Sequence, residues 1–116
     1  MKREIVLIEK FKKELQKLIE KKKILKSDFE DFKKELMENP KKGDTISGTS
    51  GIRKIRLKSS SGGKSGGFRI CYYYYVIREQ IYLIYIYAKN EQENLTTEQK
   101  YILSEIANEI KKSYKK

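Results

Sequence analysis

The stretch FRICYYYYVIREQIYLIYIY, residues 68–87, decides how this chain of 116 residues folds. Aromatic and β-branched residues fill it, and such residues favour strands. The charged pair Arg78-Glu79 divides it in two. The stretch therefore predicts two antiparallel strands, Phe68–Ile77 and Gln80–Tyr87, joined by a tight turn.

A third strand is predicted before these two, over residues 52–58, where apolar and basic side chains alternate. Its apolar side carries Ile55 and Leu57. Its other side is wholly basic and consists of Lys54, Arg56 and Lys58. The segment SSSGGKSGG, residues 59–67, connects this strand to the next, so that the three strands form an antiparallel meander.

Helical patterns flank the meander. A short strand over residues 3–8 precedes a helix whose apolar residues recur at helical spacing: Phe11, Leu15, Leu18 and Ile19. A second helix begins at the capping-box pattern of residues 27–30 (SDFE) and ends at Asn39-Pro40, because proline pushes the preceding residue out of the helical region. The last helix begins with Thr96 as its cap and Gln99 three residues later.

The elements follow one another in the order β-α-α-β-β-β-α. The length of the chain supports one hydrophobic core, so we expect a single domain over residues 1–116. Strands in a consecutive run with helices before and after them indicate the α+β class. We expect a small, twisted, mainly antiparallel sheet with helices on one face and an open, basic face on the other.

The charge balance points to a polyanionic partner. The chain has 27 Lys and Arg against 16 Asp and Glu, a net charge of +11, which attracts nucleic acid. It has no His, which excludes a histidine base and a His-ligated metal. Its single Cys, Cys71, excludes a thiolate zinc site within one chain. We therefore expect no cofactor and no metal. The apolar run Ile5–Ile8 is too short for a signal peptide or a membrane span, so we expect a cytoplasmic protein that does not bind membranes.

Positive charge is concentrated in residues 45–78, which contain seven Lys and Arg and no Asp or Glu. In this stretch Arg69 has the same parity along its strand as Tyr73. If Arg69 faces the same way as Lys54 and Arg56, the sheet presents cations for phosphates among rings on which bases stack. The alternative is a solvated face that resists aggregation, but such a face normally mixes both signs of charge. The pattern therefore favours binding of an anionic polymer.

Three spaced blocks resemble the HigB branch of the RelE/ParE toxin superfamily. They are Gly48–Arg56 (GTSGIRKIR), Gly63–Tyr73 (GKSGGFRICYY) and Tyr87–Glu91 (YAKNE) with Leu95-Thr96 after it. The resemblance implies a RelE-like fold and a type II toxin: a ribosome-dependent endoribonuclease that cuts mRNA in the ribosomal A site and inhibits translation. It also implies neutralisation by a cognate antitoxin, a HigA-like helix-turn-helix protein through which operator DNA is bound.

The resemblance assigns roles to individual residues. Two basic residues one apart on a strand match Lys54 and Arg56, and the arginine after the glycine turn matches Arg69. Lys89 matches a basic residue at the end of the last strand and completes the candidate catalytic set. The candidate RNA-binding residues are Lys58, Lys64, Tyr73, Tyr87 and Asn90.

The general acid is left open by the resemblance. Asn90 stands where RelE itself has arginine, and the downstream catalytic tyrosine of RelE has no counterpart in residues 94–96. Tyr87 and Lys89 are the two substitutes that the sequence offers.

Cleavage of RNA by its own 2′-hydroxyl needs a base, charge stabilisation and an acid, and this route requires no metal. A lysine acts as the base only as the neutral amine, which neighbouring cations favour because like charges repel. Lys54, beside Arg56, is the best candidate for that role. Arg69 suits the phosphate oxygens better than proton transfer. Two alternatives remain open on the same fold: a ParE-like gyrase poison and a non-enzymatic RNA- or ribosome-binding protein.

Overall fold

The computed structural model describes residues 2–60 and 67–114. Its elements, in chain order, are β1 (Glu4–Leu7), α1 (Glu9–Glu20), α2 (Lys26–Glu38), β2 (Asp44–Thr45), β3 (Arg53–Leu57), β4 (Phe68–Tyr75), a 3₁₀ turn (Val76–Arg78), β5 (Gln80–Ala88) and α3 (Thr97–Ser113). The expected α+β class and order of elements are confirmed. The two-residue strand β2 and the 3₁₀ turn are additions to the expected order.

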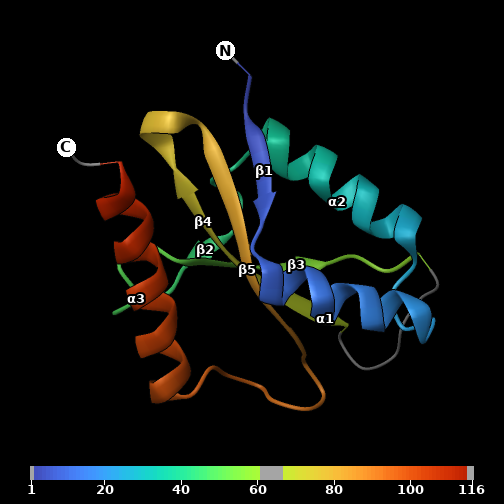
Figure 1. Ribbon diagram of the computed structural model, residues 1–116. Coiled ribbons are helices and arrows are strands. Elements are labelled where there is room, and N and C mark those ends of the chain that lie inside the picture. Colours follow the sequence, from blue (N-terminus) through green and yellow to red (C-terminus); the bar gives the residue numbers. More distant parts are fainter. Residues whose placement is uncertain (1, 61–66, 115–116) are drawn as a thin grey trace.

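The sheet is mixed and has the strand order β1-β5-β4-β3-β2 (Figure 1). The meander β3-β4-β5 is antiparallel as expected, and β2 extends it past β3. The N-terminal strand β1 lies at the opposite edge and pairs in parallel with the first half of β5, from Glu4 opposite Gln80 to Leu7 opposite Leu83. The sheet thus has β5 and β4 at its centre.

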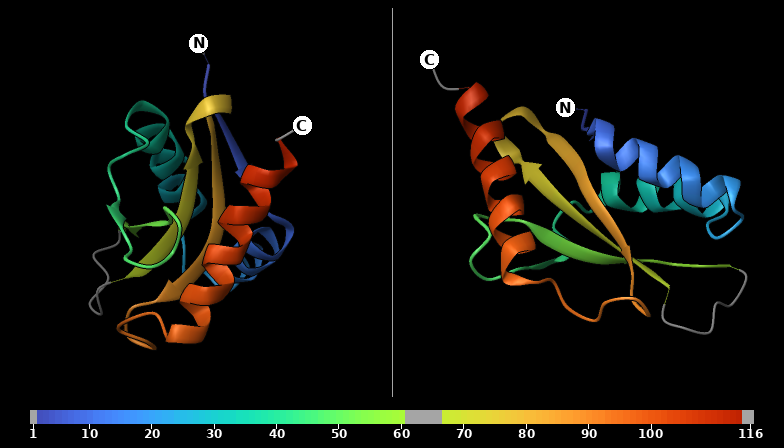
Figure 2. Two further views of the ribbon diagram at one scale, coloured as in Figure 1. Left: turned by 90° about the vertical axis from the view of Figure 1, so that its left-hand side faces the viewer. Right: turned by 60° about the horizontal axis from the view of Figure 1, so that its bottom comes forward.

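The sheet is covered on both faces by separate hydrophobic clusters. Helices α1 and α2 bury Phe11, Phe29 and Leu36 against Ile70 and Tyr72 of the sheet, together with other apolar residues. Helix α3 buries its apolar side, centred on Leu103 and Ala107, against the tyrosines of the opposite face. Figure 2 shows α3 on the other side of the sheet from the pair α1 and α2.

The position of α3 corrects the expectation that all helices lie on one face. The physical reason is that the face opposite α1 and α2 carries Tyr73 and Tyr75, whose rings need cover, and α3 supplies a matching apolar side. Only part of that face is covered. The part over β3 and the start of β4 remains, with Arg56 exposed and Lys54 and Arg69 partly exposed.

Tyr72 fixes the loop before β2. Its ring is fully buried, its hydroxyl donates a hydrogen bond to the carbonyl oxygen of Pro40 (2.7 Å) and accepts one from the backbone N–H of Gly43 (2.9 Å). A Cβ on residue 43 would lie 2.8 Å from the Tyr72 ring, so this close approach requires glycine. Arg53 adds hydrogen bonds to the carbonyl oxygens of Lys41 and Gly43 (3.0 and 2.6 Å). The loop is thereby tied to β3 and β4.

The predicted helix boundaries are confirmed at two of the three specified points. The capping box at α3 is present: Thr96 Oγ1 accepts from the Gln99 backbone N–H (3.0 Å), and Gln99 Oε1 accepts from the Thr96 backbone N–H (2.9 Å). Helix α2 ends at Glu38, directly before Asn39-Pro40. The capping box predicted at residues 27–30 is wrong, because α2 begins already at Lys26, where the buried Ile24 anchors the preceding turn in the core.

No helix among the described residues is long and apolar enough to cross a membrane. Within the same residues, no three His, Cys, Asp or Glu side chains come together in a group that could hold a metal ion.

Candidate nucleic-acid interface

Strand register brings the predicted cations together on one face. Arg56 on β3 lies opposite Arg69 on β4, and Arg69 lies opposite Tyr87 on β5. Residues directly opposite in antiparallel strands direct their side chains to the same face. Arg56, Arg69 and Tyr87 therefore form one row across the sheet, on the face that α3 covers in part.

The neighbouring row consists of Lys54, Cys71 and Tyr85 on the same three strands. Lys54 is thus one row away from Arg56 and Arg69, as the expected basic cluster requires. On its other side Lys54 lies opposite Asp44 of β2. The two rows together are called the basic face below.

A β-bulge decides that Tyr87 belongs to this face. From Tyr75 to Tyr72, β4 pairs with Gln80 to Leu83, but the register shifts after Tyr72 and Cys71 lies opposite Tyr85. Ile84 is therefore the extra residue on β5. Without it, continued pairing would place Ile86 opposite Arg69 and turn Tyr87 to the other face.

The hydroxyl of Tyr87 is buried and has no hydrogen-bond partner among the described residues. The residue is 6% exposed, and its ring stacks on that of Tyr85 with centroids 5.5 Å apart. Burial raises the pKa of the Tyr87 phenol, with a smaller raising effect from Cys71, while Arg69 opposes it. The phenol therefore keeps its proton at neutral pH and acts as a donor. A buried hydroxyl without a partner is costly, and such groups are retained at functional sites.

The end of β5 lies beside the start of β4. The Lys89 backbone N–H donates to the carbonyl oxygen of Gly67 (2.9 Å), which places Lys89 next to the row of Arg69 and Tyr87. Gly67 has a φ of +70°, a conformation that favours glycine. A Cβ on residue 67 would lie 3.9 Å from Arg56 Nε, so the arginine side chain extends toward this turn.

Cys71 is a structural residue of the site. It is fully buried beneath the face, and burial raises the pKa of its thiol to about 12, although Lys54 lowers it slightly. A thiol in this state is a poor nucleophile. Its role is to pack between Lys54 and Tyr85 under the basic face.

The other predicted RNA-binding residues differ in their surroundings. Lys58 Nζ forms an ion pair with Glu35 of α2 (3.3 Å). Tyr73 is 8% exposed, with its ring under α3 and Lys111 Nζ 5.6 Å from the ring centroid, so it presents no free ring face to a base. Asn90 is exposed in the turn after β5. Lys64 falls outside the described residues.

Two features of the site were missed by sequence reasoning. The first is Asp44, which lies opposite Lys54 and adds a carboxylate to the basic face. The only signal for it in the sequence is that it directly precedes the acid-free stretch, residues 45–78.

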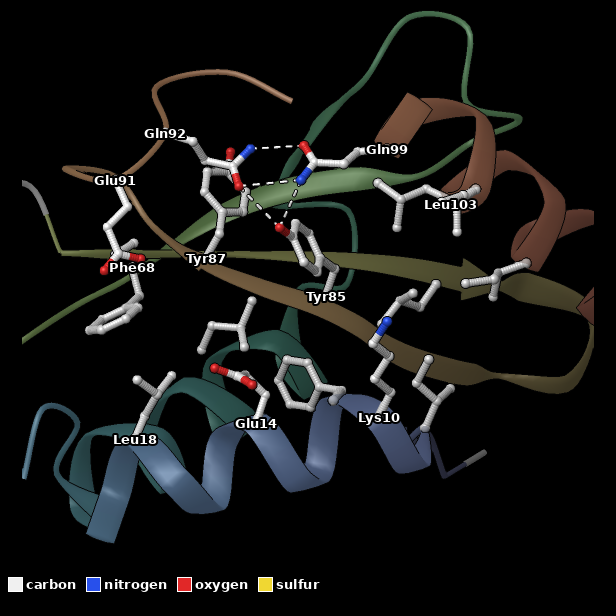
Figure 3. A pocket seen from close by; sticks show the side chains of 17 residues that line it. Lys10, Glu14, Leu18, Phe68, Tyr85, Tyr87, Glu91, Gln92, Gln99 and Leu103 are labelled. Carbon is white, nitrogen blue, oxygen red and sulfur yellow. Dashed lines mark hydrogen bonds between the residues drawn. The ribbon is translucent and has the colours of Figure 1, made fainter. Parts of the chain in front are cut away.

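The second is a hydrogen-bonded cluster that holds the chain after β5. Tyr85 donates to Gln92 Oε1 (3.0 Å) and accepts from Gln99 Nε2 (3.0 Å), and Gln92 Nε2 donates to Gln99 Oε1 (2.8 Å). Figure 3 shows this cluster above the edge of β5.

The fold and the basic face define a class of small α+β proteins suited to polyanions. Residues 8–116 match the family model "RelE toxin of RelE / RelB toxin-antitoxin system", and the chain belongs to the RelE toxin family. A solved structure of an E. coli RelE double mutant in the free state is similar, with 21% sequence identity, a TM-score of 0.58 and coverage of 91% of this chain and 97% of that chain; it supports the fold. The predicted superfamily is confirmed.

Membership has two consequences for this chain. RelE family members are endoribonucleases, so the expected kind of activity is that of the family. A toxin of this family also has a cognate antitoxin as its partner.

Proposed function

We propose that this chain is a ribosome-dependent endoribonuclease of the HigB branch, which cuts mRNA in the ribosomal A site in the cytoplasm without a metal ion. A HigA-like antitoxin is its proposed inhibitor. The observation that carries the proposal is the placement of Lys54, Arg56 and Arg69 in adjacent rows of one face, next to Tyr87. Three cations and a protonated phenol match the needs of a phosphodiester under attack.

The proposed reaction is an in-line attack of the 2′-hydroxyl oxygen on the adjacent phosphorus. Lys54, as the neutral amine, takes the proton of the 2′-hydroxyl while the new oxygen–phosphorus bond forms. The bond from phosphorus to the 5′-oxygen breaks, and that oxygen receives a proton from an acid. The products are a 2′,3′-cyclic phosphate and a free 5′-hydroxyl, so atoms and charge balance.

Arg56 and Arg69 are the groups for the non-bridging phosphate oxygens. Their planar guanidinium groups remain charged and donate two parallel hydrogen bonds, which suits the charge that develops on the phosphate. Their opposite placement on β3 and β4 allows both to approach one phosphate.

Tyr87 is the proposed acid, with Lys89 as the alternative. The phenol is protonated at neutral pH, and its row neighbour is Arg69, which binds the phosphate in this scheme. Its hydroxyl has no competing partner among the described residues. Acid–base catalysis supplies about 10²- to 10⁴-fold in rate. The remainder must come from orientation of the RNA, which explains a dependence on the ribosome.

The test compares cleavage of mRNA on programmed ribosomes with cleavage of the same RNA free in solution. We expect cleavage only on ribosomes, and its loss in Arg69→Ala. Lys58→Ala is the matched control, because it removes a cation that pairs with Glu35 away from the site. Ribosome binding without any cleavage would refute the nuclease and favour a non-enzymatic binder, and inhibition of gyrase supercoiling instead would favour a ParE-like poison.

A further inference from the structure

The two candidate acids, Tyr87 and Lys89, lie in a segment that one hydrogen-bonded cluster holds at both ends. The cluster consists of Tyr85 on β5, Gln92 in the loop after β5 and Gln99 in the first turn of α3 (Figure 3). Tyr85 precedes both candidates in the chain, and Gln92 follows them. The segment that carries the candidate acids is therefore coupled to α3 through side chains.

Gln99 is fixed at both ends of its amide. Its Oε1 accepts from the Thr96 backbone N–H (2.9 Å), which is half of the capping box of α3, and from Gln92 Nε2 (2.8 Å). Its Nε2 donates to the Tyr85 hydroxyl (3.0 Å). A side-chain amide whose oxygen and nitrogen are both bonded is held in one orientation, so Gln99 links the position of α3 to that of Tyr85.

The ring of Tyr85 passes this constraint to Tyr87. The two rings stack with their centroids 5.5 Å apart and an angle of 26° between their planes. The Tyr87 hydroxyl has no hydrogen-bond partner among the described residues, so no bond of its own fixes the direction of the phenol. Contact with the Tyr85 ring limits how far the Tyr87 ring can turn or tilt, and the bonds of the Tyr85 hydroxyl keep the Tyr85 ring in place.

We propose that Gln99 is a positioning residue for the cleavage of RNA: through Tyr85 it holds the phenol of Tyr87 where the departing 5′-oxygen would receive its proton. The proposal rests on the proposed role of Tyr87 as the acid. A displacement of about 1 Å in a reacting group can cost about 10²-fold in rate, so such a hold matters to catalysis. An apolar side chain at position 99 could fill the same space, but it would leave the Tyr85 hydroxyl with one bond instead of two.

The test compares Gln99→Ala with the matched control Thr96→Ala. Each variant removes one of the two reciprocal bonds of the capping box and weakens the start of α3, but only Gln99→Ala removes the donor to Tyr85. We expect single-turnover cleavage on saturating ribosomes to fall about 10-fold in Gln99→Ala, with unchanged ribosome affinity, and to stay near the wild-type rate in Thr96→Ala. In a Tyr87→Phe background Gln99→Ala should cause no further loss, because its effect passes through the phenol.

A second measurement does not depend on cleavage. The ring of Tyr87 should flip faster in Gln99→Ala than in the wild type or in Thr96→Ala. Ring-flip rates are measured by NMR on protein with isotope-labelled tyrosine rings, and the Tyr87 signal is identified by its absence from Tyr87→Phe. If Gln99→Ala does not fold, Tyr85→Phe takes its place in both measurements, because it keeps the stacked ring and removes only the bonded hydroxyl.

Wild-type cleavage by Gln99→Ala overturns the proposal, and so does an equal loss in Thr96→Ala, which would assign the effect to the start of the helix. A further loss in the Tyr87→Phe background also overturns it, because Gln99 would then act by a route other than the phenol. Absence of cleavage in the wild type itself would refute the proposed function. The ring-flip rates would still decide the hold on Tyr87: equal rates in Gln99→Ala and the wild type refute it, and faster flips in Gln99→Ala support it.

Discussion

Substitution of Tyr87 by phenylalanine should make the protein more stable and less active. The hydroxyl is buried without a hydrogen-bond partner among the described residues, and a buried unsatisfied polar group costs about 1–3 kcal/mol. Tyr87→Phe removes that group while it keeps the ring stacked on Tyr85. We expect unfolding free energy to rise by about 1 kcal/mol or more. For a domain of this size that corresponds to a rise in Tm of about 3–6 °C per kcal/mol.

Tyr72→Phe is the matched control in the neighbouring strand. Its hydroxyl makes two buried hydrogen bonds, to Pro40 and from Gly43, so its removal leaves a carbonyl and an N–H without a partner. We expect a loss of about 2–6 kcal/mol, from about 1–3 kcal/mol for each of the two groups left unsatisfied. Urea unfolding followed by far-UV circular dichroism measures both variants.

Activity decides whether the unpaired hydroxyl is functional. If Tyr87 is the acid, single-turnover cleavage on saturating ribosomes should fall by about 10²-fold or more, because proton transfer supplies that share. Ribosome affinity should stay near the wild-type value. Destabilisation of Tyr87→Phe as large as that of Tyr72→Phe would show that the hydroxyl is bonded in solution. Higher stability with an unchanged cleavage rate would remove Tyr87 from the mechanism and favour Lys89.

Four further predictions concern the basic face. Lys54→Arg keeps the charge but removes a group able to accept a proton, so cleavage should collapse while ribosome affinity barely moves. Near-normal single-turnover rates in Lys54→Arg would contradict the role of Lys54 as the base. Arg69→Lys loses the paired hydrogen bonds to the phosphate and should cost about 1–3 kcal/mol of transition-state stabilisation. Asp44→Asn removes the carboxylate opposite Lys54 and leaves the cations of the basic face in place, so single-turnover cleavage should persist, whereas complete loss of cleavage would make Asp44 the base. Cys71, with a pKa of about 12 and full burial, should resist iodoacetamide at pH 8 until the protein unfolds; rapid alkylation of the native protein would show that α3 leaves this face readily.

The local pattern of the sequence was sufficient to predict which side chains share a face. Alternation along β4 separates Cys71 and Tyr73 from Ile70 and Tyr72, and the two groups lie in different hydrophobic clusters. This prediction holds because side-chain direction in a strand has a period of two residues. Parity along one strand does not relate that strand to its neighbour, so the common facing of Arg69 with Lys54 and Arg56 was only a condition, and the pairing of Arg56 with Arg69 meets it.

The position of α3 was not predictable in the same way. An amphipathic pattern shows that a helix buries one side, but it does not specify which face of a sheet receives that side. The structure adds contacts that no pattern reveals: Ser50 Oγ lies 2.8 Å from Ser104 Oγ, and Lys111 Nζ donates to the Ser50 carbonyl oxygen (3.2 Å). They tie α3 to the loop before β3, on the face of the sheet that carries Tyr73.

The composition of the basic face depends on a single inserted residue. Tyr73, Tyr82 and their neighbours pair in one register near the turn, and extension of that register would place Ile86 opposite Arg69. Such a sheet would present arginines beside an isoleucine, which neither donates a proton nor binds a phosphate. The bulge at Ile84 shifts the pairing by one residue and places Tyr87 there instead, with its hydroxyl unpaired. The same shift turns the backbone N–H groups of Ile86 and Ala88 away from β4, so one irregularity in β5 decides both which side chains join the proposed catalytic row and how the backbone of the strand is directed beyond it.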